Sequence, residues 1–259
     1  MRHSTRNHSP RRCLAWGIAL AALPLARPAR AQDAAARYAH PAPVAEYLMN
    51  RSAEIALARS AAPASISSHA TVLVLGPHGY ELAVAGANGF VCMVERGWVG
   101  ALDWPEKWNP KIRGADCLNA PAARSILPLA EIRTTLALAG RPTSEIIDSL
   151  RAALGSGRVP PLAPGAMSYM MAKGSYLTDQ GDHNGPHLMF YMPVSDAAVW
   201  GAGEPGSPVE SGPYWFASES RLEQHPGLPP VRVFVVPVAT WSDGSRTSAH
   251  IAGEKESRP

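Results

Sequence analysis

The chain has 259 residues, with 24 Lys and Arg against 21 Asp and Glu. This length fits one domain with a sizeable core. The net charge of +3 belongs to the N-terminus, because residues 1–31 hold six arginines and no acidic residue. The other 228 residues have 18 basic and 21 acidic side chains, a net charge of −3. Nothing in this composition argues for a nucleic-acid partner, which would need a basic face, so we expect none.

The first 31 residues have the pattern of an export signal. Basic residues precede an apolar stretch at 13–25, which is too short to span a bilayer. Residues 29–31, Ala-Arg-Ala, fit the small-x-small cleavage rule, so we expect the mature chain to begin at Gln32. Arg11 and Arg12 also fit a twin-arginine signal, and an ordinary secretory signal is the alternative. The sequence therefore predicts a periplasmic or secreted protein with no transmembrane segment in its mature chain.

Cysteine usage predicts a disulfide bond. Cys13 lies in the signal, which leaves Cys92 and Cys117 in the mature chain. An even pair of cysteines in an oxidising compartment favours a bridge. Neither belongs to a C-x-x-C motif, and two isolated cysteines are too few for a metal site.

The first half of the mature chain is expected to combine one helix with a small sheet. Apolar residues at helical spacing predict a helix over residues 44–60. Strand patterns follow at 71–75, 80–85 and 90–95, and Asn88-Gly89 is a strong hairpin signal. We interpret these three strands as a small antiparallel meander.

Residues 98–110 carry three tryptophans among Gly, Pro and charged residues and do not match a regular element. One interpretation is a loop that packs its indoles onto the core, which is the commoner fate of large aromatic residues. The other is an aromatic platform for a sugar or another flat ligand. The residues concerned are Trp98, Trp104 and Trp108.

The second half predicts a helical hairpin at 129–139 and 143–154, with Gly140 as the cap of the first helix and Thr143 or Ser144 as the cap of the second. Apolar strands are expected at 167–171, 188–192 and 231–236. The predicted class is α+β, with a mainly antiparallel sheet and a helical layer on one side. The expected organisation is a signal peptide at 1–31, a flexible lead-in at 32–43, a single domain at 44–244 and a disordered tail at 245–259.

The loop before the strand at 188–192 is the first candidate site. It places several potential ligands or proton carriers next to a firm apolar scaffold. We expect residues 178–187 to bind a small ligand or a protein partner. The candidate binding residues are Asp179, Asp182, His183, Asn184 and His187.

A metal site in the same loop is the main alternative. His183 and His187 are four residues apart, but Gly185 and Pro186 lie between them, so a helical zinc-protease motif is excluded. A loop could still bring both imidazoles and either Asp182 or Asp179 onto one ion, and this ligand set suits zinc, iron or manganese. The bound cofactor, if there is one, would then be a transition metal that serves a hydrolase.

Other chemistries have weaker support. A histidine beside carboxylates could move protons, which leaves acid–base catalysis open. The chain has no G-x-S-x-G elbow and no phosphate-binding Gly-Lys-Ser/Thr motif. We therefore expect a non-enzymatic binding module, with a metal-dependent hydrolase and a structural envelope protein as alternatives.

Three segments resemble a family of exported bacterial proteins with no assigned activity. They are residues 88–96, NGFVCMVER, residues 167–170, MSYM, and residues 187–193, HLMFYMP. Together they span most of the mature chain. The resemblance implies a shared fold and export, and it implies no catalytic residues.

Overall fold

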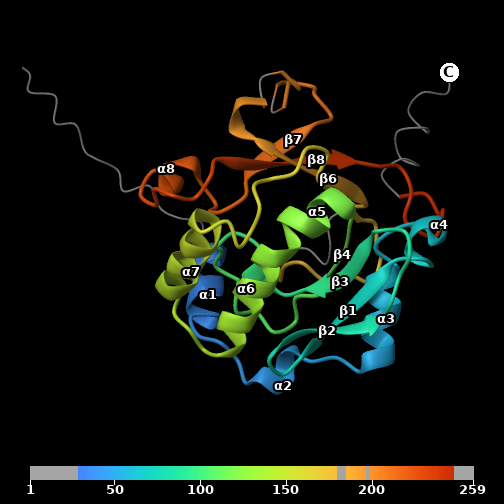
Figure 1. The fold of residues 1–259 in the computed structure, drawn as a ribbon, viewed down its shortest axis with the longest axis horizontal. Coiled ribbons are helices and arrows are strands. Elements are labelled where there is room, and N and C mark those ends of the chain that lie inside the picture. Colours follow the sequence, from blue (N-terminus) through green and yellow to red (C-terminus); the bar gives the residue numbers. More distant parts are fainter. Residues whose placement is uncertain (1–28, 180–184, 197–198, 203, 248–259) are drawn as a thin grey trace, which may run out of the picture.

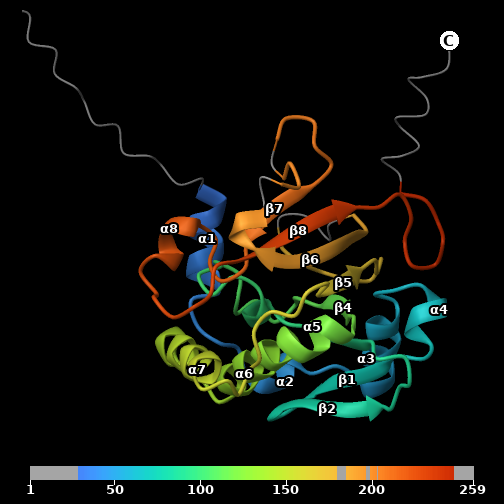
Figure 2. The same ribbon diagram turned by 45° about the horizontal axis from the view of Figure 1, so that its top comes forward.

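The computed structural model describes residues 29–179, 185–196, 199–202 and 204–247. Within these residues, eight strands form one sheet in the order β2-β1-β3-β4-β5-β6-β8-β7 (Figures 1 and 2). Every neighbouring pair is antiparallel except β1 and β3. The predicted α+β class with a mainly antiparallel sheet is confirmed.

The described strands are β1 Thr71–Gly76, β2 Gly79–Val84, β3 Val91–Glu95, β4 Gly114–Leu118, β5 Met167–Met170, β6 His187–Pro193, β7 Glu210–Pro213 and β8 Val231–Pro237. The described helices are α1 Ala29–Arg37, α2 Val44–Tyr47, α3 Arg51–Arg59, α4 Ala64–Ser67, α5 Ala120–Ser125, α6 Leu127–Leu138, α7 Thr143–Gly155 and α8 Glu219–Leu222. Two short 3-10 helices are η1 Gly97–Val99 and η2 Val194–Asp196.

The first three strands do not form the predicted meander. Strands β1 and β2 make the expected antiparallel hairpin, but β3 pairs with β1 in parallel, so β1 lies between them. The reason lies in the turn before β3. The Asn88 side chain accepts a hydrogen bond from the Phe90 amide and donates one to the Ile66 carbonyl. Asn88-Gly89 therefore attaches the chain to the segment before β1, and does not close a hairpin from β2.

The helix expected over residues 44–60 is two helices, α2 and α3. Leu48 has extended backbone, with ψ 151°. Asn50 then caps α3, because its side-chain oxygen accepts hydrogen bonds from the Ser52 and Ala53 amides. Apolar periodicity alone predicts one continuous helix, but the Asn50 cap starts a new helix within the periodic segment.

The helical hairpin of α6 and α7 is present close to its predicted position. Gly140 follows α6 with a φ of +68°, the left-handed conformation that glycine adopts without strain. Pro142 is the N-cap of α7 and makes no side-chain cap bond, so neither Thr143 nor Ser144 is the cap. The Thr143 hydroxyl accepts a hydrogen bond from Lys107.

Helices contact both faces of the strands, so a helical layer on one side is not confirmed. Because side chains alternate along β3, Cys92 and Val94 pack in one cluster with Ala58 of α3. Met93 faces the other way and packs in a second cluster with residues of α5, α6 and α7, such as Leu129. Figures 1 and 2 show α3 against the part of the sheet that holds β1, with α5 and α6 on the opposite side.

The predicted disulfide Cys92–Cys117 is present and joins β3 to β4 at directly paired positions. The chain that it encloses contains the tryptophan segment. Trp98 and Trp108 are buried, as the core interpretation predicts, whereas Trp104 is partly exposed. The bridge therefore fixes both the strand pair and the loop that leaves it.

Among the described residues, no helix is long and apolar enough to cross a membrane. The expected signal lies almost wholly outside the described residues, as does most of the expected tail. Within the tail, Arg246 forms an isolated bridge with Thr240.

Candidate functional site

The structure describes two of the five predicted binding residues. Asp182, His183 and Asn184 lie outside the described residues. Asp179 and His187 are described, and they occupy different environments. The common metal site of His183, His187 and Asp182 therefore stays a prediction. Among the described residues, no group of three His, Cys, Asp or Glu side chains could hold a metal ion.

His187 opens β6 and is buried. It pairs with Met170 across the sheet, is 6% exposed, and places its Nδ1 2.8 Å from the Gly185 carbonyl. Burial lowers the pKa of His187, so its imidazole is neutral at pH 7. A buried neutral imidazole hydrogen-bonded to the backbone anchors the start of a strand.

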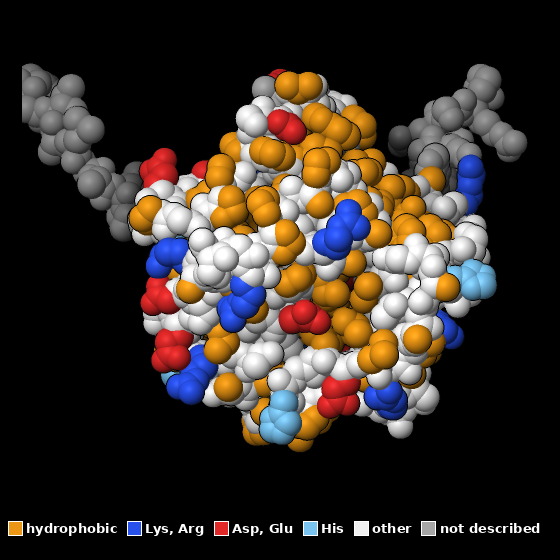
Figure 3. Space-filling view, in the orientation of Figure 1, with side chains coloured by type: hydrophobic (Ala, Val, Ile, Leu, Met, Phe, Trp, Pro, Cys, Tyr) orange, Lys and Arg blue, Asp and Glu red, His pale blue; other side chains and the backbone are white. Residues whose placement is uncertain are grey.

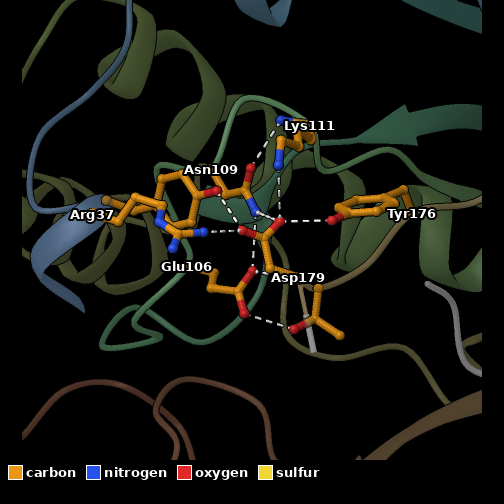
Figure 4. A network of polar contacts seen from close by, with 8 residues as sticks. Arg37, Glu106, Asn109, Lys111, Tyr176 and Asp179 are labelled. Atoms are coloured by element: carbon orange, nitrogen blue, oxygen red, sulfur yellow. Dashed lines mark hydrogen bonds and ion pairs between the residues drawn. The ribbon is translucent and has the colours of Figure 1, made fainter. Parts of the chain in front are cut away.

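Asp179 is the centre of a dense polar network (Figure 4). Its carboxylate accepts hydrogen bonds from two tyrosine hydroxyls, which lower its pKa well below the usual range. The hydrogen bond to Asp179 raises the pKa of the Tyr176 hydroxyl to about 12. The side chains that reach the carboxylate are Tyr38 (2.6 Å), Arg37 (3.1 Å), Tyr176 (2.6 Å), Asn109 (3.1 Å) and Lys111 (3.4 Å).

Glu106 extends this network below Asp179. It is 1% exposed and accepts hydrogen bonds from the Asp179 amide at 2.9 Å and the Asn109 side chain at 3.0 Å. The Thr178 hydroxyl donates to its other oxygen at 2.6 Å. We call Asp179, Glu106 and the side chains bonded to them the Asp179 clamp. The clamp joins α1 and its following residue to two loops, so the lead-in expected at 32–43 is tied to the fold.

A cleft of about 230 Å³ lies next to the clamp. Gly114 pairs with Glu95 across β3 and β4, and its lack of a side chain keeps the cleft open. A Cβ at position 114 would lie 3.1 Å from Leu177 Cδ2 and 3.3 Å from Met170 Cε. We call this hollow the Glu95 cleft. Its lining residues are Glu95, Arg96, Gly97, Gly100, Trp104, Ile112, Gly114, Leu177 and Thr178.

Glu95 is in contact with a second, fully buried carboxyl group. In the register of β3 and β4, Asp116 pairs with Met93, two residues before Glu95, so both acidic side chains lie on one face. Asp116 is 0% exposed, and neither of its oxygens accepts a hydrogen bond of good geometry from a described residue. We call Glu95 and Asp116 the carboxyl pair.

The pKa values of the carboxyl pair are raised. Burial raises the pKa of Asp116 to about 7, although the Ser168 hydroxyl, the Cys117 amide and Glu95 favour its charged form. Burial, and then the charge of Asp116, raise the pKa of Glu95 well above its usual value. Two contacting carboxyl groups with few donors therefore bind protons far more tightly than carboxylates in water.

Behind the pair lies a buried polar region that faces α6. Arg133 is 0% exposed and donates to the Val99 and Gly100 carbonyls, with its guanidinium 5.0 Å from the ring centre of Tyr214. Its Nε and Nη2 atoms and the Tyr214 hydroxyl have no hydrogen-bond partner among the described residues. Buried polar atoms of this kind are normally satisfied by ordered water.

Arg96, the basic residue that lines the Glu95 cleft, already forms an ion pair outside the cleft. The Arg96 guanidinium binds Glu54 at 2.9 Å in a fully buried ion pair and also donates to the Tyr47 carbonyl. The cleft wall therefore offers a carboxyl group and an indole, with its arginine charge already paired.

A larger cavity of about 470 Å³ lies between α6 and α7, but its chemistry is plainer. Its acid and base, Glu131 and Arg158, are both exposed. Figure 3 shows the face over α5 and α6, where hydrophobic side chains gather among scattered acidic and basic ones. Without a buried unpartnered polar group, this cavity is the weaker candidate.

In comparisons with protein-family models, curated proteins and solved structures, the chain matched none. The resemblance to exported bacterial proteins thus remains an expectation. Sequence reasoning missed the carboxyl pair, although a signal was present. Asp116 lies in the short run GADCL beside a disulfide cysteine, where an ionisable residue within an apolar strand indicates a special environment.

Proposed function

We propose that this protein is an exported, non-enzymatic module that binds a small ligand in the Glu95 cleft. The observation that carries the proposal is a small cleft lined by the Glu95 carboxyl group, whose neighbour Asp116 is fully buried and accepts no hydrogen bond of good geometry from a described residue. Retaining such a costly arrangement is typical of functional sites. The cleft includes Thr178, the first residue of the loop expected to bind at 178–187.

Binding is favoured over catalysis by the arrangement of the two acids. Glu95 lines the cleft, whereas Asp116 is fully buried behind it. Glycoside hydrolysis needs two carboxyl groups about 5 Å or more apart on either side of a bond. The nearby serine hydroxyls also serve the fold, since Ser175 accepts the Ala115 amide and Ser168 lies 3.4 Å from the Tyr191 hydroxyl.

Two alternatives remain open as proposals. A metal-dependent hydrolase would use His183 and His187 as ligands with Asp182, and a structural envelope protein would use the loop only as a turn. Metal analysis of the purified mature protein separates the first from the binding module. We expect no stoichiometric transition metal, and one equivalent of zinc, iron or manganese would favour the hydrolase.

Amide and indole NMR shifts test the proposed site directly. A mixture of small metabolites should shift signals of Glu95, Trp104 and Thr178 together. Trp104→Ala should remove that response. Trp200→Ala is the matched control, because Trp200 is 45% exposed and packs on Phe190 and Phe234, away from the cleft lining. Ligand-induced shifts confined to other regions, or none for any compound, would contradict the proposal.

A further inference from the structure

We propose that the Glu95 cleft binds a small organic ammonium ion, whose nitrogen donates a hydrogen bond to the carboxyl pair and whose alkyl part packs against Trp104. This inference rests on the proposed function, because it names the ligand class of the same cleft. Three properties of the cleft select this class: its negative charge, its need for a hydrogen-bond donor and its apolar walls.

The carboxyl pair supplies the negative charge. Gly114 is the cross-strand partner of Glu95, and Asp116 lies two residues further along β4 on the same face, so the two carboxyl groups meet diagonally across the strands. Two ionised carboxylates in contact repel each other, and one proton held between them converts the repulsion into a hydrogen bond. The pair then keeps one negative charge, and Glu95 presents it to the cleft.

The neighbouring bases leave this charge in place. Although burial has the larger effect, Arg133 from α6 acts to lower the pKa of Glu95 and so favours its ionised form. Arg133 is itself fully buried and does not line the cleft. Arg96 does line it, but its charge is neutralised by Glu54. Among the lining residues an anion would therefore meet a carboxyl group and no unpaired base, whereas a cation would meet a counterion.

The same wall needs a ligand that donates hydrogen bonds. The shared proton lies between the two acids, and the Thr178 hydroxyl already donates to Glu106. Asp116 is fully buried, and neither of its oxygens accepts a hydrogen bond of good geometry from a described residue, so its charge is costly unless a donor compensates the pair. An ammonium group brings N–H donors and a positive charge together, and such charge-assisted hydrogen bonds are roughly twice as strong as neutral ones.

The remaining walls suit a short alkyl body. Trp104, Ile112 and Leu177 give the cleft apolar surface, and the face of an indole also attracts cations. The volume of about 230 Å³ lies below the roughly 300–1,000 Å³ usual for drug-sized ligands, so the fit is to a molecule of a few carbon atoms. A metal ion fits less well, because metals take several protein ligands and no group of three His, Cys, Asp or Glu among the described residues could hold one.

Three probes with one carbon skeleton and different charges test the ligand class: isobutylamine, which is an ammonium ion at pH 7, isobutanol and isobutyrate. In NMR titrations of the mature protein at pH 7, isobutylamine should shift the Glu95 and Trp104 signals. It should bind about tenfold more tightly than isobutanol, the gain expected when a neutral hydrogen bond becomes a charge-assisted one. Isobutyrate should leave these signals unchanged.

A double variant tests whether the charge belongs to the carboxyl pair. Glu95→Gln combined with Asp116→Asn replaces both acids by uncharged side chains of nearly the same shape. Isobutylamine should then bind about tenfold more weakly, no better than isobutanol. Glu131→Gln is the matched control, because it removes one acid from the cavity between α6 and α7. A double variant that binds isobutylamine as tightly as wild type would overturn the inference.

The probe series also separates this inference from the proposed function. Equal or tighter binding of isobutanol or isobutyrate in the cleft of the wild type would overturn the ligand class and leave the proposed function standing. If none of the three probes shifted Glu95 and Trp104, the ammonium assignment would be wrong, and the mixture of metabolites would then decide the proposed function. Failure of every metabolite would overturn both.

Discussion

The Asp179 clamp and the carboxyl pair both place two acidic residues side by side, yet the surrounding chemistry is opposite. Asp179 is about 16% exposed and is reached by five donor side chains. Asp116 is fully buried, and no described residue donates a hydrogen bond of good geometry to it. The pKa of Asp179 is lowered by its hydroxyl partners, whereas burial raises the pKa of Asp116 to about 7. A carboxylate that accepts hydrogen bonds from several donors stabilises the fold. A buried carboxyl group with few donors is destabilised when it is ionised, so it favours binding a proton or a ligand that supplies a hydrogen bond.

The comparison also separates the two parts of the predicted loop. Asp179 was expected to bind a ligand, but its oxygens are occupied by the chain itself. Thr178, one residue earlier, lines the Glu95 cleft while its hydroxyl donates to Glu106. The clamp therefore holds one wall of the cleft, and Glu95 of the carboxyl pair forms part of another.

The largest expected effect removes the element that both regions share. Cys92→Ala combined with Cys117→Ala releases β3 from β4 and frees the enclosed chain that carries Glu106. The cysteines are 25 residues apart, and chain-entropy reasoning gives a loss of about 3.5 kcal/mol in unfolding free energy. Urea unfolding measures this, and reduced wild-type protein is the matched control. A variant as stable as the oxidised protein would show that the bridge does not tie the two regions.

The next effect breaks the clamp alone. Glu106→Ala leaves the Asp179 amide and the Asn109 amide group without their buried acceptor, which should cost about 3 kcal/mol. Glu106→Gln is the control, because its oxygen can face those two donors while its amide group faces the Thr178 hydroxyl. We expect it to cost about 1 kcal/mol. Equal losses for the two variants in urea unfolding would mean that charge, and not acceptor geometry, matters at this position.

The variant Asp179→Asn tests whether the stabilisation by the Asp179 carboxylate falls with falling pH, in contrast to that of the carboxyl pair. The variant should lose about 2 kcal/mol at pH 7, because two tyrosine hydroxyls donate to a charged acceptor in the wild type. The folded-state pKa is lowered, so this stabilisation is present above about pH 4 and is lost on further acidification. Unfolding midpoints at pH 3 and pH 7 check this. A difference that persists undiminished at pH 3 would contradict the assigned role.

The smallest effect on stability is expected at the cleft wall. Trp104 is only partly exposed, but it lies in a loop, and Trp104→Ala should cost about 1 kcal/mol while removing ligand binding. Trp108→Ala is the contrasting variant, since Trp108 is 6% exposed and packs in the core. It should cost about 3 kcal/mol or more. If Trp104→Ala destabilised the protein as much as Trp108→Ala, its place in the cleft would be structural.

The sequence predicted the positions of helices and strands better than it predicted which strands pair. Apolar periodicity located α6, α7, β6 and β8, and cysteine counting located the disulfide. Strand order failed at β3, because a parallel neighbour leaves no local signal in the sequence. The carboxyl pair was missed for a similar reason: β4 is a five-residue strand, and only its pairing with β3 brings Asp116 to Glu95. The clamp joins residues up to 142 positions apart, a separation that no local pattern encodes.

The most direct test of the contrast between the two acidic centres is the unfolding free energy of wild type and Asp116→Asn between pH 4 and pH 9. The folded-state pKa of Asp116 is raised to about 7, so its favourable contribution is full below about pH 4 and is lost as the pH rises through 7. Asparagine does not ionise. The account predicts two proteins of similar stability at pH 4 and a variant more stable by on the order of 2 kcal/mol at pH 8. A constant difference across this range, or a variant that becomes relatively less stable as the pH rises, would contradict it.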